Sequence, residues 1–180
     1  MTSLTDQAKS RRRREPWDRF ALKALLVLTL ILTLGAYVCD RYRIGIDDQL
    51  ARCLPPYRWY LIDTFDRRIE RDRLVAFAAT ASMAPYFRPG QTIIKRVAGV
   101  PGDRLSVSAA GTSINGSPVE QSDPALAKTL GKRADDFVRD HELVPNGQVW
   151  VMGATRDSYD SRYWGTLPIG QVTGRAYALF

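Results

Sequence analysis

Residues 92–103 read TIIKRVAGVPGD, an apolar run that is interrupted by a lysine, Lys95, and ended by a turn. The β-branched residues and the turn that follows them predict a strand over 92–100. Alternation along this strand places Lys95 on the same face as Ile93 and Val97. Because lysine is seldom fully buried without a reason, the role of Lys95 is the first question that the sequence raises.

Five further short segments are rich in β-branched, aromatic or aliphatic residues, and turn sequences separate them. They are RWYLID (58–63), RLVAF (73–77), RLSVS (104–108), QVWVMG (148–153) and GRAYALF (174–180). This spacing predicts a mainly β protein with a compact antiparallel sheet, closed or partly closed like a barrel. Residues 123–141 are polar and are expected to hold one or two helical turns within a small cap insertion, over about 108–145.

An apolar segment over residues 20–39 precedes the β pattern and contains one charge, Lys23. Its length matches the roughly 20 residues that cross a bilayer as a helix. Residues 1–19 carry six basic and three acidic side chains, so the positive-inside rule places the N-terminus in the cytoplasm. A cleaved signal peptide is the alternative, but Val38 in GAYVCD fits a small-residue cleavage site poorly. We therefore expect an uncleaved signal anchor.

The composition argues against several chemistries. The chain has 26 Lys+Arg against 19 Asp+Glu, a net charge of +7, but acidic residues are scattered through 63–160, which argues against a nucleic-acid partner. A single histidine, His141, makes a zinc site or a Ser-His-Asp triad improbable. No GxxxxGK[ST] or GxGxxG loop is present. We expect no cofactor and no metal.

Lysine as a general base remains. Of the five lysines in the chain, only Lys95 lies in an expected strand. Burial on an apolar face disfavours the ammonium form, and a neutral amine can accept a proton near neutral pH. The alternative is a lysine on an edge strand whose amine reaches water, and periodicity alone does not separate the two.

Two stretches carry a resemblance to a known family. The stretch 93–103, IIKRVAGVPGD, resembles the lysine box of type I signal peptidases (family S26), which are membrane-anchored Ser/Lys proteases. The stretch 152–176, MGATRDSYDSRYWGTLPIGQVTGRA, resembles the last box of that family, in which a serine lies near the lysine and an Asp-x-Arg pair follows. These positions fall on Ser158, Asp160 and Arg162.

The last box departs from the family pattern at two points. Residues 153–155 read Gly-Ala-Thr where the family usually has Gly-Asp-Asn, and the spacing from Arg156 to Ser158 is one residue shorter than usual. The terminal GRAYALF and the short β domain resemble the conjugal-transfer branch of the family, the TraF-type peptidases that mature pilins.

Two residues compete as the nucleophile. Ser82 in ASMAPYFRPGQ reads like the Ser-Met-x-Pro box of the family, and Cys53 in ARCLPPYRWYLID resembles the conjugal-transfer version of that box. Box order favours Cys53, because the family has a strand between nucleophile and lysine, and residues 70–77 fit that strand. A hairpin turning at RPGQ would still bring residues 82–84 opposite Lys95, so Ser82 stays the alternative nucleophile.

The resemblance implies a membrane-anchored endopeptidase that cleaves signal or leader peptides of exported precursors, with pilin or conjugal-transfer substrates expected. Cys53 would attack the scissile carbonyl, Lys95 would carry the proton, and Ser158 would hold the lysine amine by a hydrogen bond. Asp160 and Arg162 would form a structural ion pair. Hydrolysis of the acyl-enzyme and attack by a chain end both stay open. The expected partners are precursor proteins, the lipid bilayer and components of a conjugation or type IV secretion machinery.

The resemblance also divides the chain and places it in the bacterial inner membrane as a single-pass protein. The expected parts are a basic cytoplasmic tail (1–19), a transmembrane anchor (20–39), a connector (40–52) and a periplasmic catalytic domain (53–180). The rival hypothesis is an inactive membrane-tethered β-domain scaffold of a conjugation or secretion complex. In that case Cys53 would be inert or joined to Cys39 by a disulfide, which an oxidising periplasm permits.

Overall fold

The computed structural model describes residues 16–49 and 52–180, and the chain divides into two compact units, Met1–Cys39 and Asp40–Phe180. Most of the basic tail expected over 1–19, including Arg11 to Arg14, lies outside the described residues.

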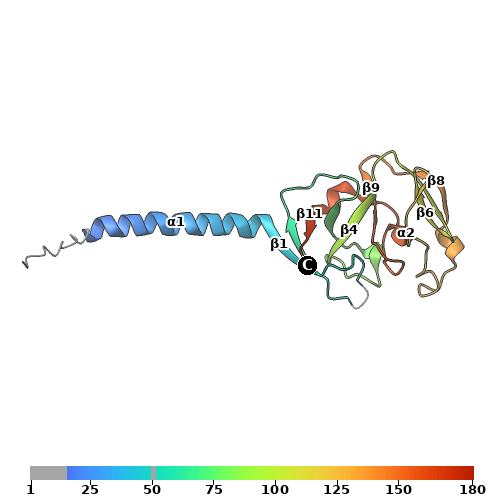
Figure 1. The fold of residues 1–180 in the computed structure, drawn as a ribbon, viewed down its shortest axis with the longest axis horizontal. Helices are drawn as coiled ribbons and strands as arrows, with labels where there is room; N and C mark the ends of the chain where they lie inside the picture. Colours follow the sequence, from blue (N-terminus) through green and yellow to red (C-terminus); the bar gives the residue numbers. More distant parts are fainter. Residues whose placement is uncertain (1–15, 50–51) are drawn as a thin grey trace, which may run out of the picture. The chain divides into compact units, whose positions relative to one another are not determined.

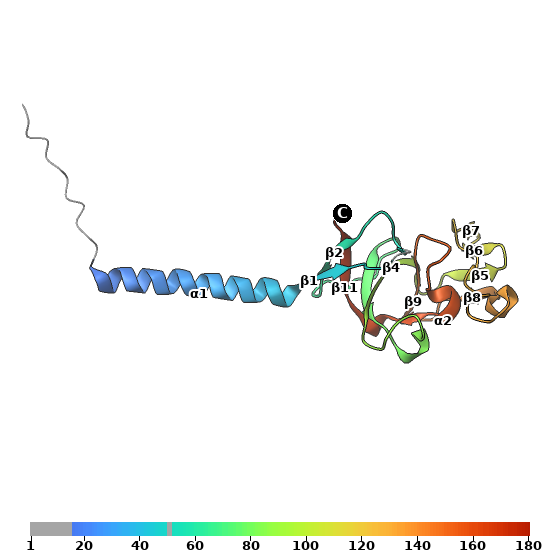
Figure 2. The same cartoon turned by 90° about the horizontal axis from the view of Figure 1, so that it is seen from below.

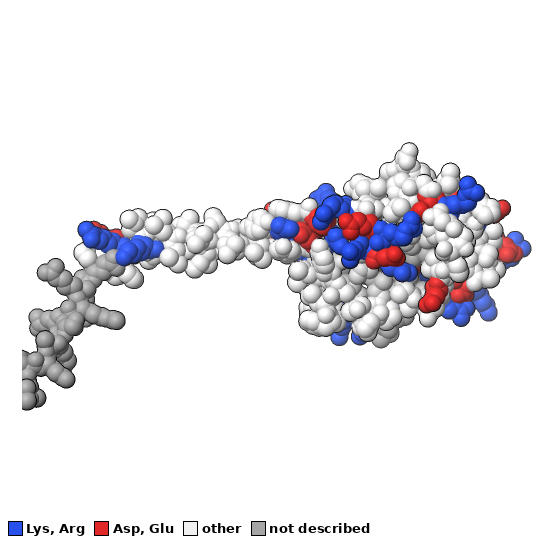
Figure 3. Space-filling view, turned by 45° about the horizontal axis from the view of Figure 1, so that its top comes forward, with Lys and Arg blue, Asp and Glu red and all other residues white. Residues whose placement is uncertain are grey.

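One long helix makes up the described part of the first unit. Helix α1 covers Trp17–Arg41, and none of its side chains is buried. Its 25 residues have a mean hydropathy of 2.1 in their most apolar window, and at 1.5 Å per residue it is about 37 Å long. Figure 3 shows almost no charged atoms along the helix beyond its N-terminal end. The helix is long and apolar enough to cross a bilayer once.

The second unit is mainly β (Figures 1 and 2). The elements in chain order are β1 (Tyr42–Ile46), β2 (Trp59–Asp63), β3 (Leu74–Ala78), η1 (Ala81–Met83), β4 (Thr92–Gly99), β5 (Arg104–Ser108), β6 (Gly111–Ile114), β7 (Ser117–Pro118), η2 (Ala134–Phe137), β8 (Arg139–Leu143), β9 (Gln148–Met152), α2 (Ser161–Trp164), β10 (Leu167–Pro168), η3 (Ile169–Gln171) and β11 (Val172–Ala178). All six strands expected from the sequence are present, which confirms the mainly β prediction.

A seven-stranded antiparallel sheet in the order β1-β2-β11-β3-β4-β9-β10 forms the main body. Strand β4 lies between β3 and β9, and alternation along it buries Ile93, Lys95 and Val97 on one face, as the sequence predicts. In the core on that face, Phe77 of β3 and Val151 of β9 belong to the same apolar cluster as Ile93 and Val97. Lys95 is therefore the polar member of a buried apolar row.

A second, four-stranded sheet in the order β7-β6-β5-β8 lies between β4 and β9 in the chain. It begins at Arg104 and ends at Leu143, so the inserted part starts earlier than the cap expected over about 108–145. The RLSVS strand belongs to it, because β5 pairs with β6 and β8 and not with the main sheet. Leu105 and Val107 belong to a small core here that also includes Trp150 of β9, so this core joins the second sheet to the main sheet. The expected helical turn is η2.

The stretch expected as a connector (40–52) contains a strand of the main sheet. β1 pairs with β2 along its whole length, with Tyr42 opposite Asp63. The sequence did not predict it because Ile44 and Ile46 point to the exposed side, so no buried alternation marks the strand. Backbone pairing with β2, which follows later in the chain, decides that the domain begins near Asp40.

Candidate active site

Lys95 is fully buried, with 1% of its surface exposed. Its Nζ donates a hydrogen bond of 2.8 Å to Ser158 Oγ, and the Phe87 ring lies 5.9 Å away, measured to its centroid. Among residues 16–49 and 52–180, no carboxylate forms an ion pair with this amine. The Lys95 amine therefore does not reach water from an edge strand, which was the alternative that the sequence left open. Its polar neighbour is the hydroxyl of Ser158.

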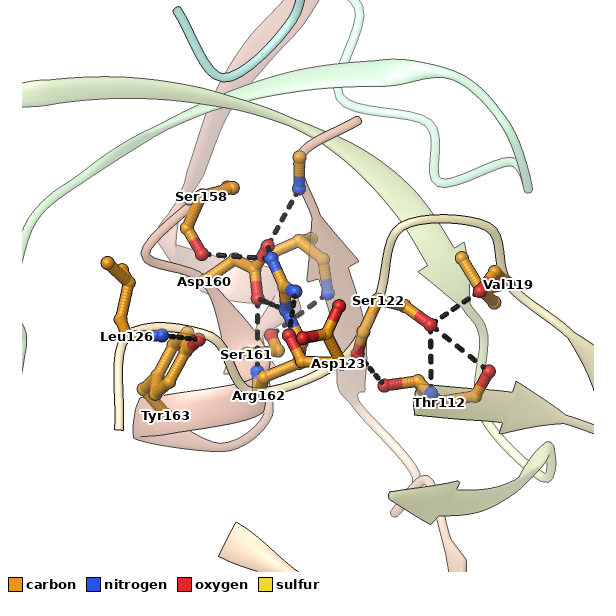
Figure 4. A network of polar contacts seen from close by, with 12 residues as sticks. Thr112, Val119, Ser122, Asp123, Leu126, Ser158, Asp160, Ser161, Arg162 and Tyr163 are labelled. Carbon is orange, nitrogen blue, oxygen red and sulfur yellow. Dashed lines mark hydrogen bonds and ion pairs between the residues drawn. The ribbon is translucent and has the colours of Figure 1, made fainter. Parts of the chain in front are cut away.

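Ser158 is held in place by the buried ion pair of Asp160 and Arg162 (Figure 4). Both side chains are fully buried and meet through two bonds, from Arg162 Nε at 2.8 Å and Nη2 at 2.9 Å. The same Nη2 donates to the Ser158 carbonyl oxygen at 2.9 Å, and Asp160 Oδ2 accepts from Gly153 N–H at 2.9 Å. The expected ion pair is present, and it fixes the backbone on both sides of the serine.

The charge of Arg162 is maintained by its partners although the side chain is buried. Burial alone disfavours the guanidinium charge, but the hydrogen bond and ion pair with Asp160 outweigh it, so the pKa of Arg162 is raised. Nη1 donates to the Asp123 carbonyl oxygen at 2.8 Å, which connects the inserted segment to this network. Arg162 thus stays charged at any pH at which the protein is folded.

Cys53 lies in the loop between β1 and β2 and is 8% exposed. Its Sγ contacts Gln49 Oε1 at 3.5 Å, and both Cys53 and Cys39 are free thiols in the structure. The Cys53 carbonyl oxygen accepts a hydrogen bond of 2.7 Å from Ala154 N–H. This bond ties the cysteine loop to the segment that carries Ser158.

Gly153 makes the close approach of these two segments possible, and sequence reasoning missed its part in the site. A Cβ on Gly153 would overlap Ser158 Oγ and would lie 2.9 Å from the Cys53 carbonyl oxygen. Cys53, Gly153, Ser158 and Lys95 are therefore joined in one continuous chain of contacts. One feature of the sequence could have pointed to Gly153: it matches the glycine of the family box, whereas the next two positions differ from that box.

Cys53 and Lys95 line the same cavity, of about 650 Å³, which we call the Cys53–Lys95 cavity. Residues 43–46 of β1 and 92–95 of β4 form two of its walls. Strand β1 is an edge strand of its sheet, and β9 pairs with β4 only from Arg96 onward. Within the described residues, both walls thus have a strand edge that no other strand covers.

Two aromatic residues line this cavity, Phe87 and Tyr60. Phe87 contacts Tyr159, the residue after Ser158, with ring centroids 6.0 Å apart. Tyr60 donates to the Leu54 carbonyl oxygen at 3.4 Å, and burial together with the nearby Asp47 and Cys53 raises the pKa of Tyr60 to about 12. Tyr60 therefore stays protonated at neutral pH and cannot act as a base there.

Ser82 lies outside this arrangement. It is exposed in η1, its Oγ is 2.8 Å from Thr80 Oγ1, and it does not line the Cys53–Lys95 cavity. The hairpin at RPGQ pairs β3 with β4 so that Val75, not residues 82–84, is opposite Lys95. The geometric argument that kept Ser82 near the lysine is wrong, because the strand partner of β4 ends at Ala78 and η1 follows it.

Within residues 16–49 and 52–180, no group of three or more His, Cys, Asp or Glu side chains could hold a metal ion. A thiol and an amine line this cavity, and the amine is bonded to a hydroxyl. Groups of these kinds can together perform acyl transfer through a covalent intermediate.

A family model described as signal peptidase, peptidase S26, matches residues 17–180, and the chain belongs to this family of endopeptidases. The conjugal transfer protein TraF of Agrobacterium fabrum is 31% identical over 90% of this chain and 94% of its own length. Signal peptidase I of Bacillus caldolyticus is 26% identical over 96% of this chain and 92% of its own length. The resemblance read from the two sequence boxes is confirmed, and it extends to both branches at similar, modest identity.

Other relatives match over a smaller part. Probable signal peptidase I-2 of Synechocystis sp. is 33% identical over 62% of this chain, and the match spans 48% of that relative. The chain thus covers about half of the length of this relative. A crystal structure of a signal peptidase I from Enterococcus faecalis, 26% identical, covers 64% of this chain and 99% of the solved chain with a TM-score of 0.39.

Proposed function

We propose that this protein is a membrane-anchored endopeptidase that removes signal or leader peptides from exported precursors, with Cys53 as nucleophile and Lys95 as general base. The observation that carries the proposal is that Cys53 and Lys95 line one cavity while the Lys95 amine is buried and bonded to Ser158. Ser82, the alternative nucleophile, is exposed and outside that cavity.

The substrate would bind as an extended strand between β1 and the first half of β4. Both strands offer uncovered edges to the Cys53–Lys95 cavity, and main-chain hydrogen bonds to such edges are a common way to hold a peptide. Apolar side chains form part of the cavity lining, among them Ile44, Ile62 and Ile93. The cavity therefore suits the apolar, small-residue end of a signal peptide.

The chemistry follows from the neighbours of each group. Lys95 takes the proton of the Cys53 thiol as sulfur attacks the scissile carbonyl carbon, and it then gives this proton to the leaving amine as the peptide bond breaks. The Cys53 N–H is proposed to donate to the oxyanion. Water, or an amine at a chain end, then resolves the thioester.

The first unit supplies the membrane anchor in this proposal. Helix α1 has the length and hydropathy of one membrane span. Basic side chains precede its apolar part, Arg19 and Lys23 among them, so the positive-inside rule supports a cytoplasmic N-terminus and a periplasmic peptidase domain.

Pilin-like precursors of a conjugation machinery are the proposed substrates. The support is the match to the conjugal transfer protein TraF, which spans nearly the full length of both chains. Components of a conjugation or type IV secretion complex would then be the partners of the enzyme in the membrane.

The test is cleavage of a pilin-like or signal-peptide precursor in membranes by the wild type and four variants, Cys53→Ala, Cys53→Ser, Lys95→Ala and Ser82→Ala. We expect Cys53→Ala and Lys95→Ala to lose cleavage and Ser82→Ala to keep it. Cys53→Ser, with a hydroxyl in the same place, is expected to retain a small part of the rate. Loss in Ser82→Ala with an active Cys53→Ala would overturn the assignment of the nucleophile.

A second readout separates the enzyme from an inactive scaffold. An active Cys53 is expected to react with a small alkylating reagent in the Cys39→Ala protein, and to react more slowly when Lys95 is replaced by methionine. A thiol that does not react, in a protein that cleaves no precursor offered, would favour the scaffold.

A further inference from the structure

A second cavity, of about 720 Å³, lies on the other side of the cysteine loop. It is lined by Leu54, Pro55 and Ala154 and by Arg96, which gives it the name used here, the Arg96 cavity. Leu54, the residue after Cys53, lines both cavities. The cysteine loop therefore stands between two hollows of similar size.

The two cavities follow each other along the hairpin of β3 and β4. Residues 92–95 of β4 line the Cys53–Lys95 cavity, and Arg96 and Ala98 line the Arg96 cavity. On β3, Ala78 lines the first and Leu74 the second. An extended peptide running along this hairpin would thus enter one cavity before it passes the cysteine and the other cavity after it.

Arg96 is an arginine of this cavity whose guanidinium makes no close hydrogen bond with the described residues. Its Nε is buried and has no hydrogen-bond partner among the described residues, and its Nη1 reaches Asp72 only at 3.6 Å. The other arginine of this cavity, Arg71, already has a carboxylate at hydrogen-bond distance: it donates to Asp103 at 2.7 Å and to the Ala98 carbonyl oxygen at 2.9 Å. Arg96 has no such bond, so an acceptor brought by a ligand would complete Arg96 first.

Building on the proposed function, we infer that the Arg96 cavity binds the leaving segment of the substrate, the first residues after the scissile bond, and selects for an acidic side chain there. A carboxylate can bond a guanidinium through two parallel hydrogen bonds, which is the strongest pairing open to arginine. Leu74, Ile114 and Val119 give the same cavity an apolar part against which the rest of the leaving segment can pack.

The test uses full-length protein in detergent and matched precursors that carry Glu, Gln or Lys, in turn, at each of the first four positions after the scissile bond. At one of these positions we expect the wild type to cleave the Glu precursor about five- to tenfold faster, in kcat/KM, than the Gln precursor, with the Lys precursor slowest. Arg96→Gln is expected to remove this ranking and Arg96→Glu to reverse it. Arg73→Gln, an exposed arginine outside both cavities, is the matched control.

Two results would overturn the inference. One is the same ranking in the wild type and in a folded Arg96→Gln protein. The other is a wild-type preference for Lys, which would assign the cavity to its acidic residues Asp72 and Glu120. Arg96→Lys keeps the charge without Nε, so it provides a second variant if Arg96→Gln does not fold.

Binding separates this inference from the proposed function. Fluorescence anisotropy with labelled leaving-segment peptides, containing Glu or Lys, is measured on the Cys53→Ala protein and on the same protein with Arg96→Gln. Tighter binding of the Glu peptide that depends on Arg96 would support the cavity assignment even if no precursor is cleaved. Cleavage by the wild type without any dependence on Arg96 would leave the proposed function intact and remove the inference.

Discussion

Single residues in this domain are placed by close contacts that tolerate little change. The approach of Cys53 to Ser158 depends on the missing side chain of Gly153, and the Lys95 amine depends on one hydroxyl. Lys95 and Ser158 are 63 residues apart in the chain, so a change at either end of this contact acts on the other through a single hydrogen bond of 2.8 Å.

Gly153→Ala tests the contact between the two segments. The added Cβ would overlap Ser158 Oγ and press on the Cys53 carbonyl oxygen, so we expect cleavage to fall by about a hundredfold, since small displacements of reacting groups have effects of that size. Initial rates with a precursor peptide measure this. Gly170→Ala is the control because a Cβ there meets no atom within 4 Å, and it should keep the wild-type rate. Equal rates for the two variants would contradict the geometry.

Ser158→Ala tests the hydroxyl that holds the lysine. Without it, the buried Lys95 amine loses the hydrogen bond that orients it, and we expect kcat/KM to fall by about ten- to a hundredfold. Ser108→Ala removes an exposed hydroxyl of β5 and is the control. An unchanged kcat/KM in a folded Ser158→Ala protein would show that the lysine is positioned by packing alone.

At the scale of elements, Asp103 lies in the turn that joins β4 of the main sheet to β5 of the second sheet, and its hydrogen bonds hold this turn. Its carboxylate accepts bonds from Arg71 at 2.7 Å, from Val100 N–H at 2.6 Å and from Asn115 at 2.8 Å. Burial works against the charge of Asp103, but these bonds outweigh it, so the pKa of Asp103 is lowered. The contribution of this carboxylate to stability is therefore present above pH 4 and is lost as the pH falls through its lowered pKa.

Asp103→Asn is expected to lower the free energy of unfolding by about 2 kcal/mol at pH 7, because a buried charged acceptor is removed from three donors. The difference from the wild type should shrink below pH 4, because there the carboxylate takes up its proton in the unfolded chain before it does so in the folded protein. Urea unfolding of the second unit at pH 7 and at pH 3 measures both values. Asp157→Asn, at an exposed position, serves as the control. A difference that is the same at both pH values would refute the role of the charge.

Strands with several buried apolar residues were predictable and the others were not. β4 shows a buried alternation in its first half, while β3 and β9 are apolar runs that are buried at consecutive positions. β1 exposes both of its isoleucines, and β7 and β10 have two residues each, so their patterns carry no periodic signal. Their backbone pairing with strands from other parts of the chain determines them.

For the whole molecule, the division into two compact units suggests that the peptidase domain folds without the helix. None of the α1 side chains is buried, so removing residues 1–39 takes no side chain out of the domain core. We expect a 40–180 fragment to unfold cooperatively and to cleave a soluble peptide with the kcat/KM of the full chain, but to lose cleavage of a membrane-inserted precursor. Thermal circular dichroism and peptide cleavage in detergent measure this, with the full chain as the reference. A fragment that does not fold would show that the helix stabilises the domain.

The sequence by itself determined the class of this protein. Local patterns of side chains were enough to identify the apolar span, the strand that carries Lys95 and the two family boxes. The last family box also predicted the Asp160–Arg162 pair, whose two residues lie within one local motif. Only the tertiary structure placed Cys53 in the lysine cavity and Ser82 outside it, and only it showed the role of Gly153. Such contacts join segments about 40 to 100 residues apart, and pairing between distant strands, which no local pattern encodes, brings them together.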